Sequence, residues 1–273
     1  MSAENPQAEA DEFWLFGYGS LIWKPPPHFD RRIPGWVTGY VRRFWQASED
    51  HRGTPEAPGR VVTLISREYW EQLTDHHDSA PEKVWGVAYR IIPERVAEVK
   101  DYLDIREING YTIHYTPFHP APSLNPNDPL TALPKQQPIQ TLVYIGTPDN
   151  EQFVGPQDPQ KLAEHIYRSE GPSGLNRDYL WGLEKALNEL SLESGDEHVT
   201  DLSNRVRAVA AAAAEGQGVV SQTDKEKQIL RAQSPVNVSP EVSSSLEHQH
   251  EHHHHEFKKV SSIDEQEETE KTS

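Results

Sequence analysis

The stretch FGYGSLIWKP, Phe16 to Pro25, places two glycines and a serine directly after an apolar run that is typical of a buried strand. Glycine allows a positive φ and lets a ligand approach the backbone closely. Successive backbone N–H groups in such a turn form a small concavity for an anion. A carboxylate suits it better than a phosphate, because Ile22 stands where a dinucleotide-binding turn needs its third glycine. A purely structural turn is the other interpretation of this motif alone.

The composition excludes several classes of protein. The chain of 273 residues has 43 acidic and 26 basic side chains, a net charge of −17, which argues against binding to nucleic acid or to an anionic membrane. Because it has no cysteine, disulfides, thiolate metal sites and a cysteine nucleophile are excluded. The first residues do not resemble a secretory signal, and no apolar run is long enough to span a bilayer. We expect a cytoplasmic protein.

The chain divides into regions of different composition. Residues 191–273 carry sixteen acidic and eight basic side chains, and all seven tryptophans precede Ser191. A segment this poor in aromatic residues lacks the means to form a core. We therefore predict a polar N-terminal tail at 1–12, one domain at 13–190, and an acidic, His-rich, mostly disordered tail at 191–273. Within the tail, Arg205 to Glu215 is expected to form at most a lone helix with little to anchor it.

The order of strands and helices predicts an α+β domain. Six stretches read as strands, namely DEFWLFGYGS, GWVTGYVRRFW, RVVTLI, VWGVAYRII, YTIHYTPF and QTLVYIGT. Turn residues such as KPPPHFD and RGTPEAPG separate them, and residues 121–138 form a long proline-rich loop. Helices are predicted over 93–106, 158–169 and 175–190. Because strands and helices do not alternate regularly, we expect a mostly antiparallel, barrel-like sheet with flanking helices.

A second informative stretch is YLDIREINGY, Tyr102 to Tyr111, where a helix ends and a strand begins. A carboxylate at such a junction can lie near apolar surface, which raises its pKa and suits it to proton transfer. Glu107 is the candidate. A solvated Glu107, or an ion pair with Arg106, is the alternative.

The stretch from Arg42 to Leu64 mixes aromatic residues with many polar ones. These polar side chains could line a pocket or form a hydrogen-bond network that fixes a loop, and we favour the network for most of them. The members of this set are Arg43, Gln46, Ser48, Asp50, His51 and Arg52.

Taken together, these motifs resemble the ChaC family of glutathione-specific γ-glutamylcyclotransferases. The resemblance covers nearly all of the chain from Phe13 to about Leu190. It is carried by six stretches in order, FGYGSLIWKP, GWVTGYVRRFWQASEDHRGTPEAPGRVVTL, WGVAYRI, YLDIREINGY, LVYIGTP and SEGPSGLNRDYL. The YGSL turn and the YLDIRE stretch together make it specific.

The resemblance implies a γ-glutamylcyclotransferase-like fold and the conversion of glutathione into 5-oxoproline and cysteinylglycine. It implies that Glu107 is the catalytic acid and base. It also implies that the turn and the preceding strand end cradle the γ-glutamyl group, through Leu15, Phe16, Gly17, Tyr18, Gly19, Ser20 and Leu21. The substrate carries its own nucleophile, the α-amine, so no cofactor, metal ion or protein nucleophile is expected. Glu98, nine residues before Glu107, could assist at the edge of the pocket, but we favour a solvated helix face for it.

Three other functions stay open at this stage. One is a cyclotransferase for other γ-glutamyl peptides or amines, and another is a non-catalytic binding protein that acts through the acidic tail. The third is metal buffering by the run HQHEHHHHE, His248 to Glu256, although we favour adventitious metal binding there. Deletion of the residues after Ser191 is expected to leave an enzyme active and to abolish a function of the tail.

Overall fold

The computed structural model describes residues 12–77, 80–106, 111–122, 129–131 and 138–232. The chain divides into two compact units, Met1–Asp224 and Lys225–Ser273. Of the second unit, only residues 225–232 are described.

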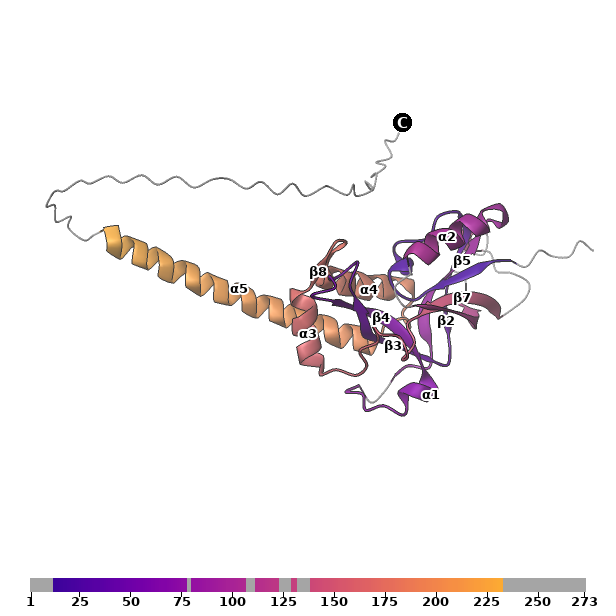
Figure 1. The fold of residues 1–273 in the computed structure, drawn as a ribbon, viewed down its shortest axis with the longest axis horizontal. Coiled ribbons are helices and arrows are strands. Elements are labelled where there is room, and N and C mark those ends of the chain that lie inside the picture. Colours follow the sequence, from indigo (N-terminus) through magenta and orange to yellow (C-terminus); the bar gives the residue numbers. More distant parts are fainter. Residues whose placement is uncertain (1–11, 78–79, 107–110, 123–128, 132–137, 233–273) are drawn as a thin grey trace, which may run out of the picture. The chain divides into compact units, whose positions relative to one another are not determined.

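A closed barrel of five strands forms the centre of the first unit, in the order β1-β5-β2-β6-β7 (Figure 1). Strands β1 and β7 are paired in parallel, and the other neighbours are antiparallel. The strands are β1 (Trp14–Gly17), β2 (Phe29–Val37), β5 (Val84–Ile91), β6 (Thr112–Pro120) and β7 (Ile139–Ile145). This confirms the predicted α+β class with a small barrel-like sheet.

Strands β3 (Tyr40–Ser48) and β4 (Gly59–Ser66) form a separate antiparallel hairpin. The prediction of one strand over GWVTGYVRRFW was wrong, because the chain turns at Gly39, which has a φ of +81°, and divides the run between β2 and β3. The prediction of a turn over KPPPHFD was also wrong for its last two residues, which belong to a strand. Strand β2 begins at Phe29, where it pairs with β5.

The helices agree closely with the sequence pattern. Helix α2 (Val96–Arg106) follows a short 3₁₀ turn that begins at Pro93. Helix α3 (Pro159–Arg168) begins after Asp158, whose carboxylate accepts a hydrogen bond from the backbone N–H of Lys161. Helix α4 spans Asn176–Leu190 and α5 spans Glu197–Ala232. The remaining short elements are α1 (Arg67–Trp70), the 3₁₀ turns η1 (Ser20–Ile22), η2 (Pro93–Arg95) and η3 (Pro129–Thr131), β8 (Glu170–Gly171) and β9 (Gly174–Leu175).

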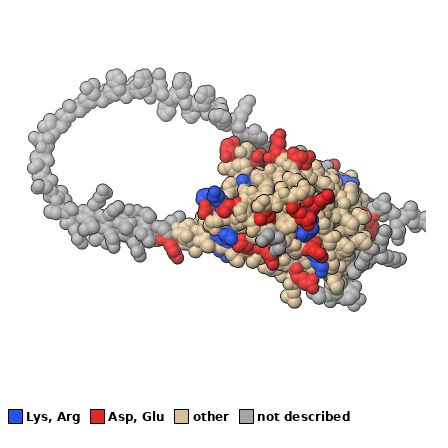
Figure 2. Space-filling view, turned by 90° about the horizontal axis from the view of Figure 1, so that it is seen from below, with Lys and Arg blue, Asp and Glu red and all other residues tan. Residues whose placement is uncertain are grey.

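Acidic side chains are spread over the face of the molecule shown in Figure 2, as the net charge of −17 leads one to expect. Several basic side chains are paired with them. Arg90 contacts Asp30 and Glu12, and Arg205 contacts Asp201 on the same helix.

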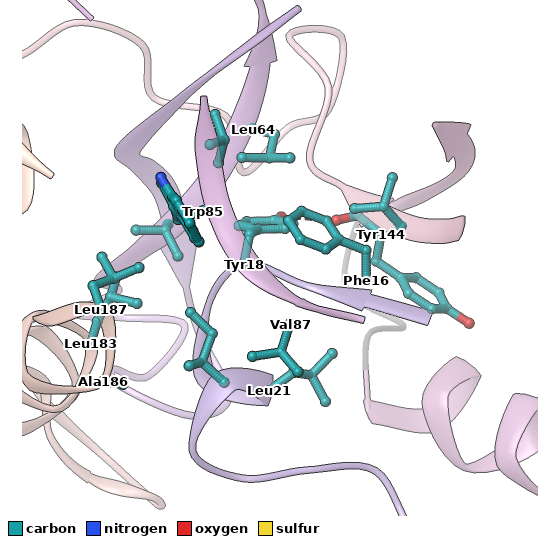
Figure 3. Packing of buried hydrophobic residues seen from close by; sticks show 14 of the residues in the cluster. Phe16, Tyr18, Leu21, Leu64, Trp85, Val87, Tyr144, Leu183, Ala186 and Leu187 are labelled. Carbon is teal, nitrogen blue, oxygen red and sulfur yellow. Dashed lines mark hydrogen bonds between the residues drawn. The ribbon is translucent and has the colours of Figure 1, made fainter. Parts of the chain in front are cut away.

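One large hydrophobic core joins the barrel to α4. In Figure 3, Leu183, Ala186 and Leu187 of α4 lie near Trp85 of β5, and Phe16 and Tyr18 lie among the barrel side chains. A smaller cluster of Val41, Trp45, Ile65 and Trp70 lies on the hairpin and α1. The barrel and the hairpin are therefore held by side chains from well-separated parts of the sequence.

The packed unit does not end at Leu190, so the predicted boundary there is too early. Val199, Leu202 and Val206 of α5 are buried in the main core. Just before the helix, the buried carboxylate of Asp196 pairs with the buried Arg42 of β3 at 3.2 Å. The interpretation of this region as a lone, unanchored helix was therefore wrong, because three apolar residues at helical spacing and an ion pair attach it to the core.

His198, in the first turn of α5, is buried and linked to two other elements. Its Nε2 accepts a hydrogen bond from the Phe44 backbone N–H at 3.1 Å, so its proton lies on Nδ1, which is 3.3 Å from Nδ1 of His77. The remaining proton of His77 then points to Asp201, 3.1 Å from its Nε2. One backbone N–H thus fixes the tautomers of both imidazoles.

Burial holds the pKa of His198 well below its usual range, and the charges of Arg43 and Arg42 act in the same direction. The unfolded chain binds this proton near pH 6.5, whereas the folded protein binds it only at lower pH. The free energy of unfolding therefore falls as the pH decreases below about 6.5, by up to about 1.4 kcal/mol per pH unit for this group.

The variant His198→Gln isolates the effect, because the amide oxygen of glutamine can accept the Phe44 hydrogen bond but does not titrate. Chemical denaturation at several pH values between 5 and 7 should show a shallower pH dependence for the variant. His165, whose pKa is also lowered by burial, contributes equally to both proteins and cancels in the comparison. Identical slopes would show that folding does not lower the pKa of His198.

Candidate active site

The glycine turn lies at the carboxyl end of β1. The strand ends at Gly17, Tyr18 and Gly19 follow, and η1 begins at Ser20. The carbonyl of Gly19 accepts a hydrogen bond from the backbone N–H of Ile22. The carbonyl of Ser20 accepts hydrogen bonds from the backbone N–H groups of Trp23 and Lys24. The turn is thus closed by backbone hydrogen bonds directly after the end of β1.

Two tyrosine hydroxyls fix the turn to the barrel. Tyr18 Oη donates to the carbonyl of Tyr144 at 2.8 Å, and Tyr89 Oη donates to the carbonyl of Leu21 at 2.7 Å. These bonds tie the turn to β7 and β5. The turn is therefore positioned by the core rather than by solvent-exposed contacts.

The predicted binding residues have different roles in the structure. The side chains of Leu15, Phe16, Tyr18 and Leu21 are buried in the main core, where they hold the backbone in place. Gly17 is buried as well, whereas Gly19 and Ser20 are partly exposed. Binding of a ligand by this segment stays a prediction, and it would involve the backbone around Gly19 and Ser20.

The two glycines of the turn are required for space and not for a positive φ. Among the described glycines, positive φ occurs at Gly39, Gly155 and Gly174. A Cβ on Gly17 would lie 2.5 Å from Cβ of Leu21, and one on Gly19 would lie 3.1 Å from both Tyr179 Oη and Val62 Cγ2. Leu21 therefore excludes a side chain at Gly17, whereas a side chain at Gly19 would require Tyr179 and Val62 to move by a few tenths of an ångström.

We expect Gly17→Ala to lower catalytic turnover strongly, by about tenfold or more, because displacement of a positioned backbone by even about 1 Å is costly. The matched control is Gly182→Ala in α4, where the new methyl would lie 3.4 Å from Trp23, an ordinary contact distance. Alanine is favoured over glycine inside a helix by about 1 kcal/mol. The control should keep activity and stability; equal activity of the two variants would show that the turn geometry is not needed.

Three strand ends meet beside this turn. The pairing of Leu15 with Leu142 places the carboxyl ends of β1 and β7 together, and the pairing of Thr112 with Ile145 places the start of β6 at the same end of the barrel. Glu107 lies outside the described residues, five positions before Thr112. Strand β6, the next described element along the chain, begins at the end of the barrel where the glycine turn lies, and the catalytic role of Glu107 stays a prediction.

The loop between β3 and β4 and the segment before α4 form a connected wall beside the turn. The buried side chain of Asn176 bonds to both the N–H and the carbonyl of Arg60, each at 2.7 Å. A Cβ on Gly171 would lie 2.4 Å from the backbone of His51 and Gly53, so these two segments pack backbone against backbone.

The polar residues of Arg42 to Leu64 mainly form a structural network, as favoured from the sequence. Arg43 Nε donates to Asp75 at 2.6 Å, and Ser48 Oγ accepts from the Arg52 N–H at 3.0 Å. His51 Nδ1 lies 3.1 Å from Ser173 Oγ.

Sequence reasoning missed Tyr179, whose hydroxyl lies against Gly19. Its ring packs against Trp23 and Phe44, with centroids 5.7 and 5.9 Å away. Tyr179 and Asn176 are three residues apart on the buried face of α4, a position where polar groups are unusual. This pattern was a signal that could have pointed to the site.

Other candidates contribute less. Glu98 is exposed and contacts Arg95 at 2.7 Å and His28 at 3.0 Å, which agrees with a solvated helix face. The His-rich run lies outside the described residues. Within the ranges that the structure covers, no cluster of three or more metal-ligating side chains occurs. Within the same ranges, no helix has the length and apolar character needed to cross a membrane.

The fold and the turn together define a γ-glutamylcyclotransferase-like domain. The family model for ChaC-like proteins matches residues 13–209. The chain belongs to this family, which confirms the resemblance inferred from the sequence. The match extends past Leu190, as does the packed core.

Curated relatives match over most of their length. A fission yeast (Schizosaccharomyces pombe) protein named glutathione-specific γ-glutamylcyclotransferase is 46% identical over 195 residues, which cover 71% of this chain and 92% of the relative. A Saccharomyces cerevisiae protein of the same name is 42% identical, covering 69% of this chain and 90% of the relative. The crystal structure of a yeast γ-glutamyl cyclotransferase specific to glutathione has a TM-score of 0.65 and 40% identity, covering 73% of this chain and 97% of that chain.

Proposed function

We propose that this protein degrades glutathione by intramolecular cyclisation of the γ-glutamyl group, giving 5-oxoproline and cysteinylglycine. The observation that carries the proposal is the 46% identity to a relative of that name over 92% of its length. The glycine turn at the end of the parallel pair β1 and β7 supports it, because successive backbone N–H groups in such a turn suit a small carboxylate.

The reaction forms one C–N bond and breaks another. The α-nitrogen of the γ-glutamyl group attacks its own γ-carbonyl carbon, a five-membered ring closes, and the amide bond to cysteine breaks. At neutral pH the α-nitrogen starts as an ammonium and ends as the ring amide N–H, so it loses two protons. A base must remove the first before the attack. The departing amide nitrogen gains two protons and leaves as an ammonium. No water enters the products and no cofactor is required.

In our proposal, one carboxyl group performs both proton transfers. Glu107 takes a proton from the ammonium and delivers it to the leaving nitrogen, and the second proton that the ring nitrogen loses passes in the same direction to the freed amine, which departs as an ammonium. The backbone around Gly19 and Ser20 binds the α-carboxylate and holds the amine against the γ-carbonyl. Such positioning lowers the activation free energy of ring closure by several kcal/mol, because the reacting groups are already oriented when the substrate is bound. The proposal includes a cytoplasmic location, because the cytosol holds a reduced glutathione pool.

A parallel incubation tests the substrate. Purified protein is mixed with reduced glutathione, γ-glutamyl-alanine or γ-glutamyl-lysine, and 5-oxoproline is followed by chromatography. Release from glutathione alone is the expected result. Release mainly from the other two would keep the chemistry and overturn the substrate. No release from any of them by a folded protein would favour the non-catalytic alternative.

A further inference from the structure

Arg52 is a half-buried cation beside the candidate site. It lies in the loop between β3 and β4, and its Cζ is 5.7 Å from the ring centroid of Tyr179. Its Nη1 donates to the carbonyl of Leu175 at 3.1 Å. Arg52 forms no ion pair with any carboxylate that the structure describes, although Asp178 is near enough to act on its pKa, which burial lowers. A guanidinium carries five N–H groups, so most of its donors are available.

The ring of Tyr179 connects Arg52 to the glycine turn. The guanidinium lies over this ring, and the hydroxyl of the same ring lies 3.1 Å from the Cβ position of Gly19. The side chain of Tyr179 therefore contacts Arg52 with its ring and the glycine turn with its hydroxyl. An extended chain reaches about 3.3 to 3.6 Å per residue, so a tripeptide whose first residue binds at the turn is long enough to reach Arg52.

The loop that carries Arg52 is held firmly. The Arg52 N–H bonds to Ser48 Oγ, and the carbonyl of the preceding His51 accepts the Ser173 amide hydrogen bond at 2.9 Å. A Cβ on Gly53 would lie 2.0 Å from the Gly59 nitrogen, so the two sides of the loop are in direct contact. A cation on such a loop is preorganised to bind a ligand.

The charge of the substrate requires such a cation. Glutathione has two carboxylates and one ammonium at neutral pH, whereas the protein has a net charge of −17 and an acidic surface (Figure 2). The segment from Leu15 to Ile22 contains no charged side chain, so it offers backbone and hydroxyl dipoles to the first carboxylate but no positive charge. The second carboxylate, on the glycyl residue, needs a positive charge of its own.

We propose that Arg52 binds the glycyl carboxylate of glutathione and so distinguishes the tripeptide from γ-glutamyl compounds that lack this group. The inference rests on the proposed function and deepens it. A planar guanidinium matches the two oxygens of a carboxylate and binds them with two parallel hydrogen bonds. The substrate is thus held at both ends, by the turn and by Arg52.

A second arginine provides a matched control. Arg177 lies over Tyr167 with its Cζ 4.8 Å from the ring centroid, and its Nη1 donates to the Tyr167 carbonyl at 3.2 Å. It has the same kind of surroundings as Arg52, namely a tyrosine ring and one backbone carbonyl. The structure gives it no contact with Tyr179 or the glycine turn.

The experiment compares two substrates in four proteins. The substrates are glutathione and its glycyl amide, in which a neutral carboxamide replaces the carboxylate. The proteins are the wild type, Arg52→Gln, Arg52→Lys and Arg177→Gln. The readouts are kcat and KM for 5-oxoproline release, with thermal unfolding to check that each variant is folded.

The wild type should prefer glutathione over the amide by about 10- to 100-fold in kcat/KM, the range for a charge-assisted hydrogen-bonded pair. Arg52→Gln should lower kcat/KM for glutathione by a similar factor, mainly through KM, and leave the amide nearly unchanged. Arg52→Lys should restore part of the preference, and Arg177→Gln should retain all of it.

Equal losses on both substrates in Arg52→Gln would overturn the inference, because a structural defect cannot sense the glycyl carboxylate. The absence of any preference in the wild type would overturn it too, while leaving the proposed function intact. If the wild type released 5-oxoproline from neither substrate, the proposed function itself would fail, and this inference with it.

Discussion

Replacement of Glu107 by glutamine is expected to lower kcat for 5-oxoproline release by about 100- to 10,000-fold, the usual contribution of a positioned acid and base. Glutamine has nearly the same shape but cannot take the proton from the ammonium or deliver it to the leaving amine. KM should change little, because in the proposed mechanism the backbone of the glycine turn, and not Glu107, binds the substrate. Steady-state kinetics with glutathione measure both quantities.

The matched control is Glu98→Gln, the same chemical change on the exposed face of α2. Glu98 contacts Arg95 and His28 at the surface, so its loss should leave kcat nearly unchanged. A folded Glu107→Gln protein with wild-type turnover would show that another group moves the proton.

Truncation of the chain after Leu190 is expected to unfold the protein, contrary to what the sequence suggested for a deletion of the tail. The truncation removes Val199, Leu202 and Val206 from the core, at about 1.5–3 kcal/mol each. It also leaves Arg42 buried without Asp196, at a further cost of about 3–5 kcal/mol. The total is comparable to the entire stability of a typical domain, about 5–15 kcal/mol.

Truncation after Asp224 is the control, because it keeps the whole first compact unit. Circular dichroism, thermal unfolding and activity should be close to those of the full chain. It also tests whether the His-rich run contributes to function. A folded, active protein ending at Leu190 would show that the contacts of α5 with the core are not needed.

The strands of the barrel were predictable because each is a short run of β-branched and aromatic residues bounded by turn residues. The division of GWVTGYVRRFW was not, because nothing in the composition of the run distinguishes a turn at Gly39 from a glycine inside a strand. The pairing of β2 with β5 starts at Phe29, and that contact depends on a strand more than fifty residues away.

The role of α5 was hidden for a similar reason. Its first turns contain many polar and alanine residues, so average composition indicated disorder. Three buried residues and the pairs made by Asp196 and His198 attach it to the core, and a composition average does not detect so few contacts.

The site was predictable in part. The glycine turn was recognised, but the contact of Tyr179 with Gly19 joins two segments that only folding brings together. The buried roles of Leu15, Phe16, Tyr18 and Leu21 also became clear only from the structure. The assignment of Glu107 still rests on the resemblance of its stretch of sequence to the family pattern.

The central claim is that the γ-glutamyl amide is cleaved by cyclisation and not by water. The most direct measurement incubates the purified full chain with glutathione in water enriched in oxygen-18 and analyses the products by mass spectrometry. Cyclisation predicts equal amounts of 5-oxoproline and cysteinylglycine, with no oxygen-18 incorporated into either product by the reaction. Free glutamate that carries the label would show hydrolysis and contradict the account.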